Sequence, residues 1–587
     1  MVPVLLLLGL ALAARPASAV IEVRQDGFGD ATTVANGLLA AAPGEEVRIT
    51  DGNTYNESGL VISGSRRLTS VPVGATISGS GVILTLAGGA ENNRVEGVTV
   101  ISNSLCIVVN AGDGSTPEII NTFVQGTDTL VTGIQVFNQV SSTLTPATVT
   151  LADVTFNILG TGLLHMNFGF GNVPEQAACN YSVSALDFAA IGGTCIRFTR
   201  PASGIFSGIL ADGISGNVIT VDEGARFSQL SFNNVNALNF GDTGVYVNED
   251  NVIVTLDSPT FSGGQRGVHL GDLLTPLTGL PTIELLGTGS ITGASENGIR
   301  LDAACNLTLG AITITSTGTN ATDAGLYASD FASGTTVTAN GTIFQSNANR
   351  AVHAVSGVVS PGGNALWSFT NCRFLDSGTA EILFDGSSST GNQLLLNRCL
   401  LREANARLAG GSSLMVLNSI DATLRNCVLE LGDNHGLQHS GSSPLVLEHC
   451  TISAPVSSPV AAMSLAGTSL TVRNSVVDAP SGDVVTGISA WTESNNVFRG
   501  LISSSLLPLA ATSQVADPVF SLPNLGPGTG NFVLLAGSPC PGGGDPAVGL
   551  TVDFNGVARP NPAATNPDIG AYETVLVPVE LSGLALE

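Results

Sequence analysis

The stretch ATLRNCVLE, from Ala422 to Glu430, has two close copies further along the chain. It returns as LVLEHCTIS from Leu445 to Ser453 and as LTVRNSVVD from Leu470 to Asp478. Each copy alternates apolar, polar and apolar residues, then has two polar residues, a small residue and another apolar one. Apolar residues at every second position are typical of a β-strand with one buried face. Each copy therefore predicts a short strand that ends in a bend.

Seven copies can be aligned on their small residue, which we call position zero. These residues lie 23 to 30 residues apart: Ile312, Thr342, Cys372, Cys399, Cys427, Cys450 and Ser475. The residues five and three before position zero, and two after it, are apolar in all seven copies. Position −1 is polar in the five later copies: Asn371, Arg398, Asn426, His449 and Asn474. Asn tolerates left-handed backbone angles and bonds to nearby backbone, so this column predicts a bend in each copy.

A second short strand recurs in the segments GVYV, GVHL, GIRL and GLYA, which begin at Gly244, Gly267, Gly298 and Gly325. Each repeat therefore holds two or three short strands. A unit of this length cannot bury its own apolar face, whereas stacked copies share a continuous core. Helical repeats do not fit because the period of 3.6 is missing, and a propeller blade needs about 40 residues. The sequence predicts an all-β fold, a right-handed parallel β-helix (solenoid).

The chain is strongly acidic, with 20 basic against 46 acidic groups among 587 residues and a net charge of −26. Every basic residue is Arg. A chain of this charge repels nucleic acid and anionic membranes, so neither is an expected partner.

The first residues, MVPVLLLLGLALAARPASA, combine an apolar run with the small-x-small sequence Ala17-Ser18-Ala19. The run is too short to span a bilayer, so it predicts a secretory signal peptide over residues 1–19; an uncleaved anchor is the alternative. We therefore expect a secreted or cell-surface protein with no transmembrane segment in the mature chain.

The remaining residues fall into four predicted segments. They are an N-terminal cap with the first coils (20–90), the β-helix repeats (91–500), an irregular C-terminal closing segment (501–575) and a tail (576–587). In the first of these, Val34, Leu38 and Leu39 lie at helical spacing and Pro43-Gly44 ends the run. This pattern predicts a short N-terminal capping helix.

Three stretches resemble a known family: ATTVANGLLAAAPGEEVRITDGNTYNE near the start, DPVF at Asp517, and AGSPCPGGGDPAVGLTVDFNGVARPNPAATNPDIGAYE, which ends at Glu573. They are similar to the entry and closing segments of bacterial right-handed parallel β-helix repeat proteins of the pectate-lyase-like superfamily. The last stretch, a DIGAYE-type closing segment, is the most specific of the three. The resemblance implies a secreted or surface-anchored β-helix, and enzymes of this fold mostly act on acidic polysaccharides.

Catalysis on a polysaccharide needs particular groups. β-Elimination uses a strong base, usually Lys or Arg, and hydrolysis uses two or three clustered carboxylates. The chain has no Lys, no Gly-His-Gly and no Arg-x-Lys. The best catalytic candidates form one cluster in the sequence: Arg425, Asp433, His435, His439 and Glu448.

Within this cluster, a His oriented by a carboxylate could act as a general base. The alternative is structural. Arg425, Glu448 and Arg473 occupy equivalent positions on successive coils and would form a charge ladder, while His449 would fill a bend position.

Two further sets of residues are candidates for binding or cross-linking. Asp51, Asn53 and Glu57 offer oxygen ligands for calcium, the one cofactor we consider, but the stretch lacks the full calcium-loop pattern and coincides with the first-coil turn of the family. Cys179 and Cys195 flank an irregular insertion and could form a disulfide. Four aligned cysteines are predicted to be buried, inert thiols: Cys372, Cys399, Cys427 and Cys450.

Because the scaffold is clear and each catalytic signal is weak, we expect an exported, non-catalytic and monomeric β-helix protein. Its expected role is adhesion or glycan binding, with a polysaccharide or cell-surface glycan as partner. The alternative is an enzyme, either a polysaccharide lyase or a glycoside hydrolase, that acts in a groove along the β-helix.

Overall fold

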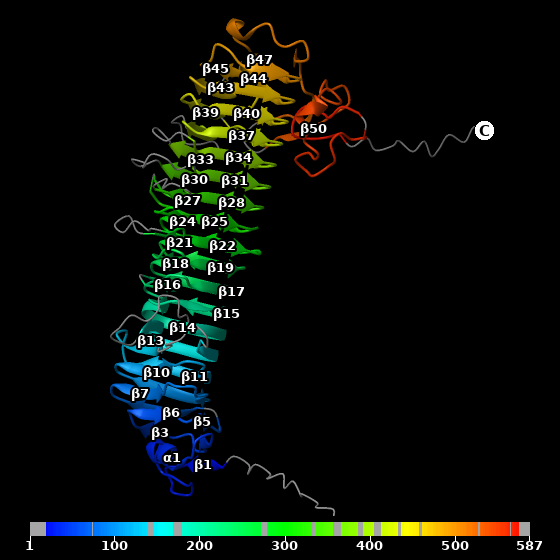
Figure 1. Ribbon diagram of the computed structural model, residues 1–587. Coiled ribbons are helices and arrows are strands. Elements are labelled where there is room, and N and C mark those ends of the chain that lie inside the picture. Colours follow the sequence, from blue (N-terminus) through cyan, green and yellow to red (C-terminus); the bar gives the residue numbers. More distant parts are fainter. Residues whose placement is uncertain are drawn as a thin grey trace, which may run out of the picture. The chain divides into compact units, whose positions relative to one another are not determined.

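The computed structural model describes residues 19–574 except 73, 139–145, 168–178, 223, 272–278, 321, 330–334, 356–364, 386–390, 404–412, 433–435, 457–460, 526–528 and 564. The chain divides into two compact units, Met1–Asp187 and Phe188–Glu587. Each unit is a coil of short parallel strands, as predicted (Figure 1). Among the described residues, no helix is both long and apolar enough to cross a membrane.

The first unit begins with a capped coil. Helix α1 (Val34–Ala40) starts at Thr33, whose side chain accepts a hydrogen bond from the Asn36 amide at 3.1 Å, and it packs against β1, β2 and β4. The predicted capping helix is confirmed, with Leu38 buried and Leu39 exposed. The strands of this unit are β1 (Val20–Val23), β2 (Glu46–Ile49), β3 (Thr54–Asn56), β4 (Leu60–Ile62), β5 (Arg67–Ser70), β6 (Ala75–Gly79), β7 (Val82–Leu86), β8 (Arg94–Glu96), β9 (Val98–Ser102), β10 (Leu105–Ala111), β11 (Glu118–Gly126), β12 (Thr132–Asn138) and β13 (Thr148–Asn167).

The second unit begins within β14 (Cys179–Phe198) and continues through β15 (Ala202–Asp212) and β17 (Gln229–Phe240). From there each coil contributes one strand to each of three parallel stacks. The first stack holds β19 (Ile253–Asp257), β22 (Thr282–Leu286), β25 (Asn306–Leu309), β28 (Thr336–Asn340), β31 (Leu366–Thr370), β34 (Gln393–Asn397), β37 (Asp421–Arg425), β40 (Pro444–Glu448), β43 (Ser469–Arg473) and β46 (Thr492–Ser494).

The second stack holds β20 (Thr260–Gly263), β23 (Ser290–Thr292), β26 (Thr313–Thr315), β29 (Ile343–Gln345), β32 (Arg373–Leu375), β35 (Leu400–Arg402), β38 (Val428–Glu430), β41 (Thr451–Ser453), β44 (Val476–Asp483), β47 (Val497–Leu501) and β48 (Gln514–Val515). The third stack holds β16 (Ile219–Val221), β18 (Thr243–Val247), β21 (Arg266–Leu270), β24 (Asn297–Leu301), β27 (Ala324–Ala328), β30 (Arg350–Val355), β33 (Ala380–Asp385), β36 (Met415–Asn418), β39 (Leu437–Ser440), β42 (Met463–Ala466) and β45 (Val485–Thr486). The chain then forms η1 (Ser504–Leu506), an antiparallel pair of β49 (Phe520–Leu522) and β50 (Asn531–Leu534), and η2 (Pro546–Val548).

The core consists of apolar columns that run from coil to coil. In the first stack the register pairs Trp367 with Leu394, Leu394 with Ala422 and Ala422 with Leu445. These residues belong to the predicted column five before position zero, and each is at most 1% exposed. Aromatic rings continue the contact between stacks, since Trp367 meets Phe384 edge to face with 5.2 Å between ring centroids. The predicted core columns are confirmed.

The predicted bends are also confirmed. All five polar residues at position −1 have left-handed backbone angles: Asn371 at φ 54°, Arg398 at 56°, Asn426 at 49°, His449 at 52° and Asn474 at 50°. This conformation costs an ordinary L-residue about 1–2 kcal/mol, and Asn adopts it more readily than most. The bend turns the chain from the first stack into the second.

The position-zero thiols are buried at these bends. The Sγ of Cys399 lies 3.3 Å from the Phe369 carbonyl oxygen one coil earlier, and that of Cys450 lies 3.3 Å from the Leu424 oxygen. The Ser475 hydroxyl donates instead to the Arg473 carbonyl oxygen of its own coil, at 2.8 Å. A small side chain with one donor therefore suits this position, and the prediction that these cysteines are buried is confirmed.

A pair of substitutions tests the bends. We expect Asn371→Ala to lower the free energy of unfolding by about 1 kcal/mol more than Asn371→Gly, because only glycine takes a left-handed angle without a steric cost. Both changes remove the same exposed hydrogen bond from Asn371 to Asn340, so the bond cancels in the comparison. Urea denaturation of the two variants measures the difference, and equal midpoints would show that the bend is not under this constraint.

Candidate functional site

The predicted catalytic cluster does not assemble among its described members. Arg425 and Glu448 do meet, with the Nε of Arg425 2.8 Å from Oε2, but Arg473 approaches the same carboxylate at 3.9 Å. The three residues are register partners on β37, β40 and β43. They form the charge ladder that was the alternative explanation. Both arginines are nearly half exposed, so the ladder stabilises the fold only weakly.

His439 lies on the third stack, away from the strand that carries Glu448. Its ring nitrogens contact the Thr468 hydroxyl at 2.7 Å and the Ile420 carbonyl oxygen at 2.9 Å. Burial lowers the pKa of His439. This histidine is a bonded core residue, so the prediction that groups it with Glu448 is wrong. Asp433 and His435 lie outside the described residues.

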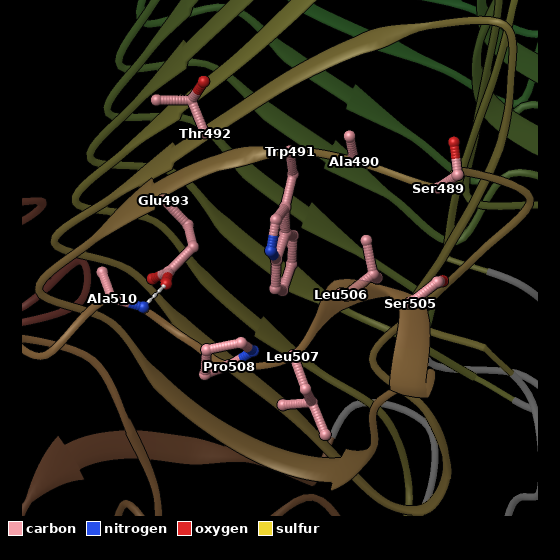
Figure 2. A pocket seen from close by; sticks show the side chains of 10 residues that line it. All are labelled: Ser489, Ala490, Trp491, Thr492, Glu493, Ser505, Leu506, Leu507, Pro508 and Ala510. Carbon is pink, nitrogen blue, oxygen red and sulfur yellow. Dashed lines mark hydrogen bonds between the residues drawn. The ribbon is translucent and has the colours of Figure 1, made fainter.

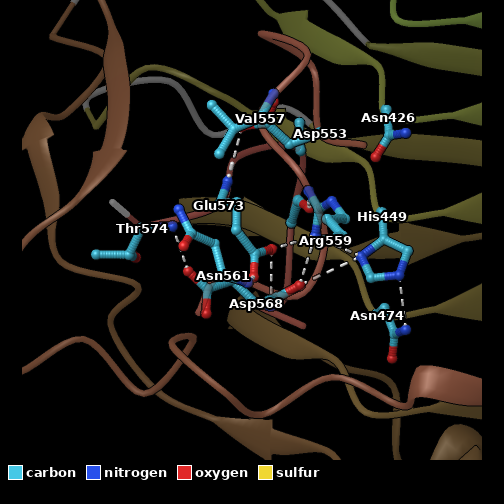
Figure 3. A network of polar contacts seen from close by, with 12 residues as sticks. Asn426, His449, Asn474, Asp553, Val557, Arg559, Asn561, Asp568, Glu573 and Thr574 are labelled. Atoms are coloured by element: carbon cyan, nitrogen blue, oxygen red, sulfur yellow. Dashed lines mark hydrogen bonds and ion pairs between the residues drawn. The ribbon is translucent and has the colours of Figure 1, made fainter. Parts of the chain in front are cut away.

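The side chain of His449 extends from the bend and contacts the closing segment (Figure 3). Its Nδ1 lies 2.8 Å from Nη1 of Arg559, which itself donates to the Asp568 carbonyl oxygen at 2.8 Å and pairs with Glu573 at 3.2 Å. The side chains of Arg559 and Glu573 are fully buried. Burial and the neighbouring Arg559 lower the pKa of His449 to about 3, so the ring is neutral at neutral pH.

Three asparagines at bends hold the same segment through their side-chain amide groups. Asn474 donates to the Asp545 carbonyl oxygen at 2.9 Å and accepts from the Asp545 amide at 2.7 Å. Asn426 donates to Val552 at 2.8 Å, and Asn495 donates to Gly543 at 3.0 Å. The closing segment is therefore bound to the bends, and its charged residues Arg559 and Glu573 stabilise that contact.

The buried contact between His449 and Arg559 predicts that the protein loses stability in acid. The unfolded His449 takes up a proton near its ordinary pKa of 6.5, whereas the folded one does so near 3. The contribution of this group to stability is therefore complete above about pH 6.5 and decreases by up to about 1.4 kcal/mol per pH unit below it.

Replacing His449 with Asn, the residue found at neighbouring bends, should remove this slope and keep the left-handed angle. Urea denaturation at neutral pH and at about pH 4.5 measures the effect as the difference between wild type and His449→Asn. The contribution is refuted if both proteins lose the same stability on acidification.

The calcium candidates already have partners within the chain. The Asp51 carboxylate accepts hydrogen bonds from the Tyr55 hydroxyl at 2.6 Å, the Gln25 amide at 2.8 Å and the Asn53 amide group at 2.9 Å. Glu57 instead accepts from two amides at the start of α1, both at 2.8 Å. Over the described part of the chain, no three His, Cys, Asp or Glu side chains gather in a way that could hold a metal ion.

Cys179 and Cys195 do not form the predicted disulfide in this structure. Both thiols are free and buried, and burial raises the pKa of Cys195 well above its usual value. The sequence pattern suggested a bridge because the two residues flank an insertion. In the structure both belong to the continuous strand β14.

A different polar site lies on the outer face of the third stack. Five register partners on successive coils form it, and we call them the aromatic column: Tyr246, His269, Arg300, Tyr327 and His353. The residues on either side of each one in the chain are buried, so the column points away from the core by strand alternation. Four of its members are partly exposed, and His353 at the end of the row is buried, with 5% exposure.

The rings and the guanidinium of the column are in contact. Tyr246 and His269 have ring centroids 5.1 Å apart, and Tyr327 and His353 are 5.2 Å apart. The guanidinium carbon of Arg300 lies 5.4 Å from the centre of the Tyr327 ring, within the range of a cation–π interaction. The column is therefore an ordered strip of aromatic and polar groups.

Asp302 ties the middle of the column together. Its carboxylate binds Nε2 of His269 at 2.8 Å, Nε of Arg300 at 2.6 Å and the Ser329 hydroxyl. These hydrogen bonds outweigh burial and lower the pKa of Asp302 to about 2. In the tautomer that donates from Nε2 to this carboxylate, Nδ1 of the His269 ring is an acceptor.

Sequence analysis missed this column although its signal was present. The strands of GVYV, GVHL, GIRL and GLYA were used for their apolar and glycine positions. The third residue of each is Tyr246, His269, Arg300 and Tyr327, and aligning the repeats on their glycines places these four in one row.

One family model agrees with this architecture. The family described as "Right handed beta helix region" matches residues 356–500, about a quarter of the chain. The crystal structure of pectate lyase Pel9A is similar with 14% sequence identity, over 79% of this chain and 88% of that one, at a TM-score of 0.23. None of the curated proteins compared matches. At this identity the likeness concerns the fold alone.

Proposed function

We propose that the protein is an exported, non-catalytic glycan-binding β-helix that binds an extended polysaccharide or cell-surface glycan along the aromatic column. The observation that carries the proposal is the row of Tyr246, His269, Arg300, Tyr327 and His353 on one outer face. Successive coils are about 4.8 Å apart, so the column repeats its groups at short, regular intervals, as a polymer of similar units requires.

The chemistry of the column suits sugar rings. The tyrosine rings can stack on the apolar C–H face of a pyranose, while His269 and the Arg300 guanidinium can bond to its hydroxyl groups. The rings are held before any ligand arrives, because Arg300 is fixed by Asp302 and lies over Tyr327. A preformed surface loses little side-chain entropy on binding.

The carboxylates favour binding over hydrolysis. A glycoside hydrolase needs one carboxyl group that stays protonated near neutral pH, whereas Asp302 is held ionised by three donors. Two buried carboxyl groups with a raised pKa, Asp478 and Glu573, lie elsewhere in the fold. Asp478 is paired with Arg499 and Glu573 belongs to the buried closing segment, so neither faces the column.

One observation supports the alternative of a polysaccharide-degrading enzyme. His269, oriented by Asp302 at 2.8 Å, is a possible general base because Nδ1 remains an acceptor. Incubation with a panel of polysaccharides, with calcium present, separates the two functions. Release of reducing ends indicates hydrolysis, and a rise in ultraviolet absorbance indicates elimination. Turnover that disappears in His269→Ala would replace the non-catalytic proposal.

Binding is tested by affinity electrophoresis through gels that contain one soluble polysaccharide each. We expect at least one polysaccharide to retard the protein, and Tyr327→Ala to weaken that binding by about tenfold, or about 1.4 kcal/mol. Tyr327→Phe keeps the ring and should retain most of the affinity.

The matched control is Gln438→Ala, because Gln438 occupies the same register row further along the third stack. Its affinity should equal that of wild type. The proposal fails if no polysaccharide binds, or if Tyr327→Ala and Gln438→Ala behave alike.

A further inference from the structure

A separate cavity of about 440 Å³ lies near the C-terminal end of the β-helix, between residues 489–493 and 505–510 (Figure 2). We call this cavity the cap pocket. Trp491, Leu506, Leu507 and Pro508 form its apolar lining. Its volume falls within the range of about 300–1,000 Å³ that is usual for small-molecule sites.

Trp491 is the distinctive group of the cap pocket. One face of its indole stacks on the buried ring of Phe498, with centroids 5.1 Å apart and planes 23° apart. Figure 2 shows the indole directed into the space bordered by Leu506, Leu507 and Pro508. The chain has two tryptophans. The other, Trp367, is fully buried in the core, whereas Trp491 is only half-buried.

The walls of the pocket are held by Glu493, which uses its carboxylate for the fold. One oxygen accepts from the Ala510 amide (Figure 2), and the other accepts from the Ser513 hydroxyl and from the Asn496 side chain at 3.2 Å. These bonds fix the loop opposite Trp491. They also occupy the one charge of the lining, which contains no arginine.

We propose that the cap pocket binds a single neutral pyranose residue, such as a chain end or a side branch. A pyranose has an apolar C–H face that fits the indole of Trp491 and a rim of hydroxyl groups. Ser489 and Thr492 place exposed hydroxyl groups at the edge of the pocket to meet that rim. An anionic sugar finds no cation in the lining and meets a carboxylate instead. The pocket shares no residue with the aromatic column and does not depend on the function proposed for it.

The experiment is a titration of the full chain with the methyl glycosides of several neutral pyranoses, followed by tryptophan fluorescence and by saturation-transfer NMR. We expect one of them to change the Trp491 emission saturably and to receive saturation mainly on the protons of one ring face. Trp491→Ala should weaken binding by about tenfold or more, and Trp491→Phe should have a smaller effect.

Gln438→Ala serves as the matched control, since Gln438 lies outside both the aromatic column and the lining of the cap pocket. It should bind the monosaccharide as wild type does. Unchanged melting temperatures show that the variants are folded. The proposal is overturned if no glycoside gives a saturable signal, if Trp491→Ala binds as well as wild type, or if phenol binds at Trp491 while every sugar fails.

Discussion

Backbone hydrogen bonds from each strand to the equivalent strands one coil before and one coil after impose the order of this fold. The register carries Leu394 onto Ala422 and Ala422 onto Leu445 without a slip. Because paired side chains point the same way at steps of about 4.8 Å, a residue type chosen in one coil constrains the next. Inside, this constraint produces apolar columns that exclude water. Outside, it produces rows of interacting groups, such as the oppositely charged Arg425, Glu448 and Arg473.

The bends repeat in the same register, and their side chains form the surface on which the closing segment packs. A left-handed residue is needed where the first stack passes into the second, and Asn meets that need with an amide group that remains available outside the core. Asn426 and Asn474 use this group to hold the closing segment. Asparagine therefore both adopts the left-handed angle that the bend needs and holds the distant closing segment through its side chain. His449 occupies the same place and forms its contact with Arg559 instead.

The features that could be predicted from the sequence are those that depend on neighbouring residues or on the repeat. The alternation around Cys427, the left-handed bend at Asn426 and the helix that begins at Val34 are all of this kind. The contact that His449 makes could not be predicted in this way, because its partner Arg559 is 110 residues away in the chain. The hydrogen bond from the Gln25 amide to the Asp51 carboxylate could not be predicted for a similar reason, since it joins residues 26 apart in the chain.

The geometry that makes the coil stable also determines how its outer groups are arranged. Catalysis needs unlike groups that converge on one atom, with the pKa of one carboxyl group raised and that of another lowered. A stack of parallel strands distributes many of its outer groups along a line, and neighbouring charges in that line neutralise one another, as Arg425 and Glu448 do. A polymer can use such a line because each of its units meets a similar surface. The aromatic column is a line of this kind. The cap pocket has Trp491 as the aromatic residue of its lining, and this arrangement suits a single sugar unit.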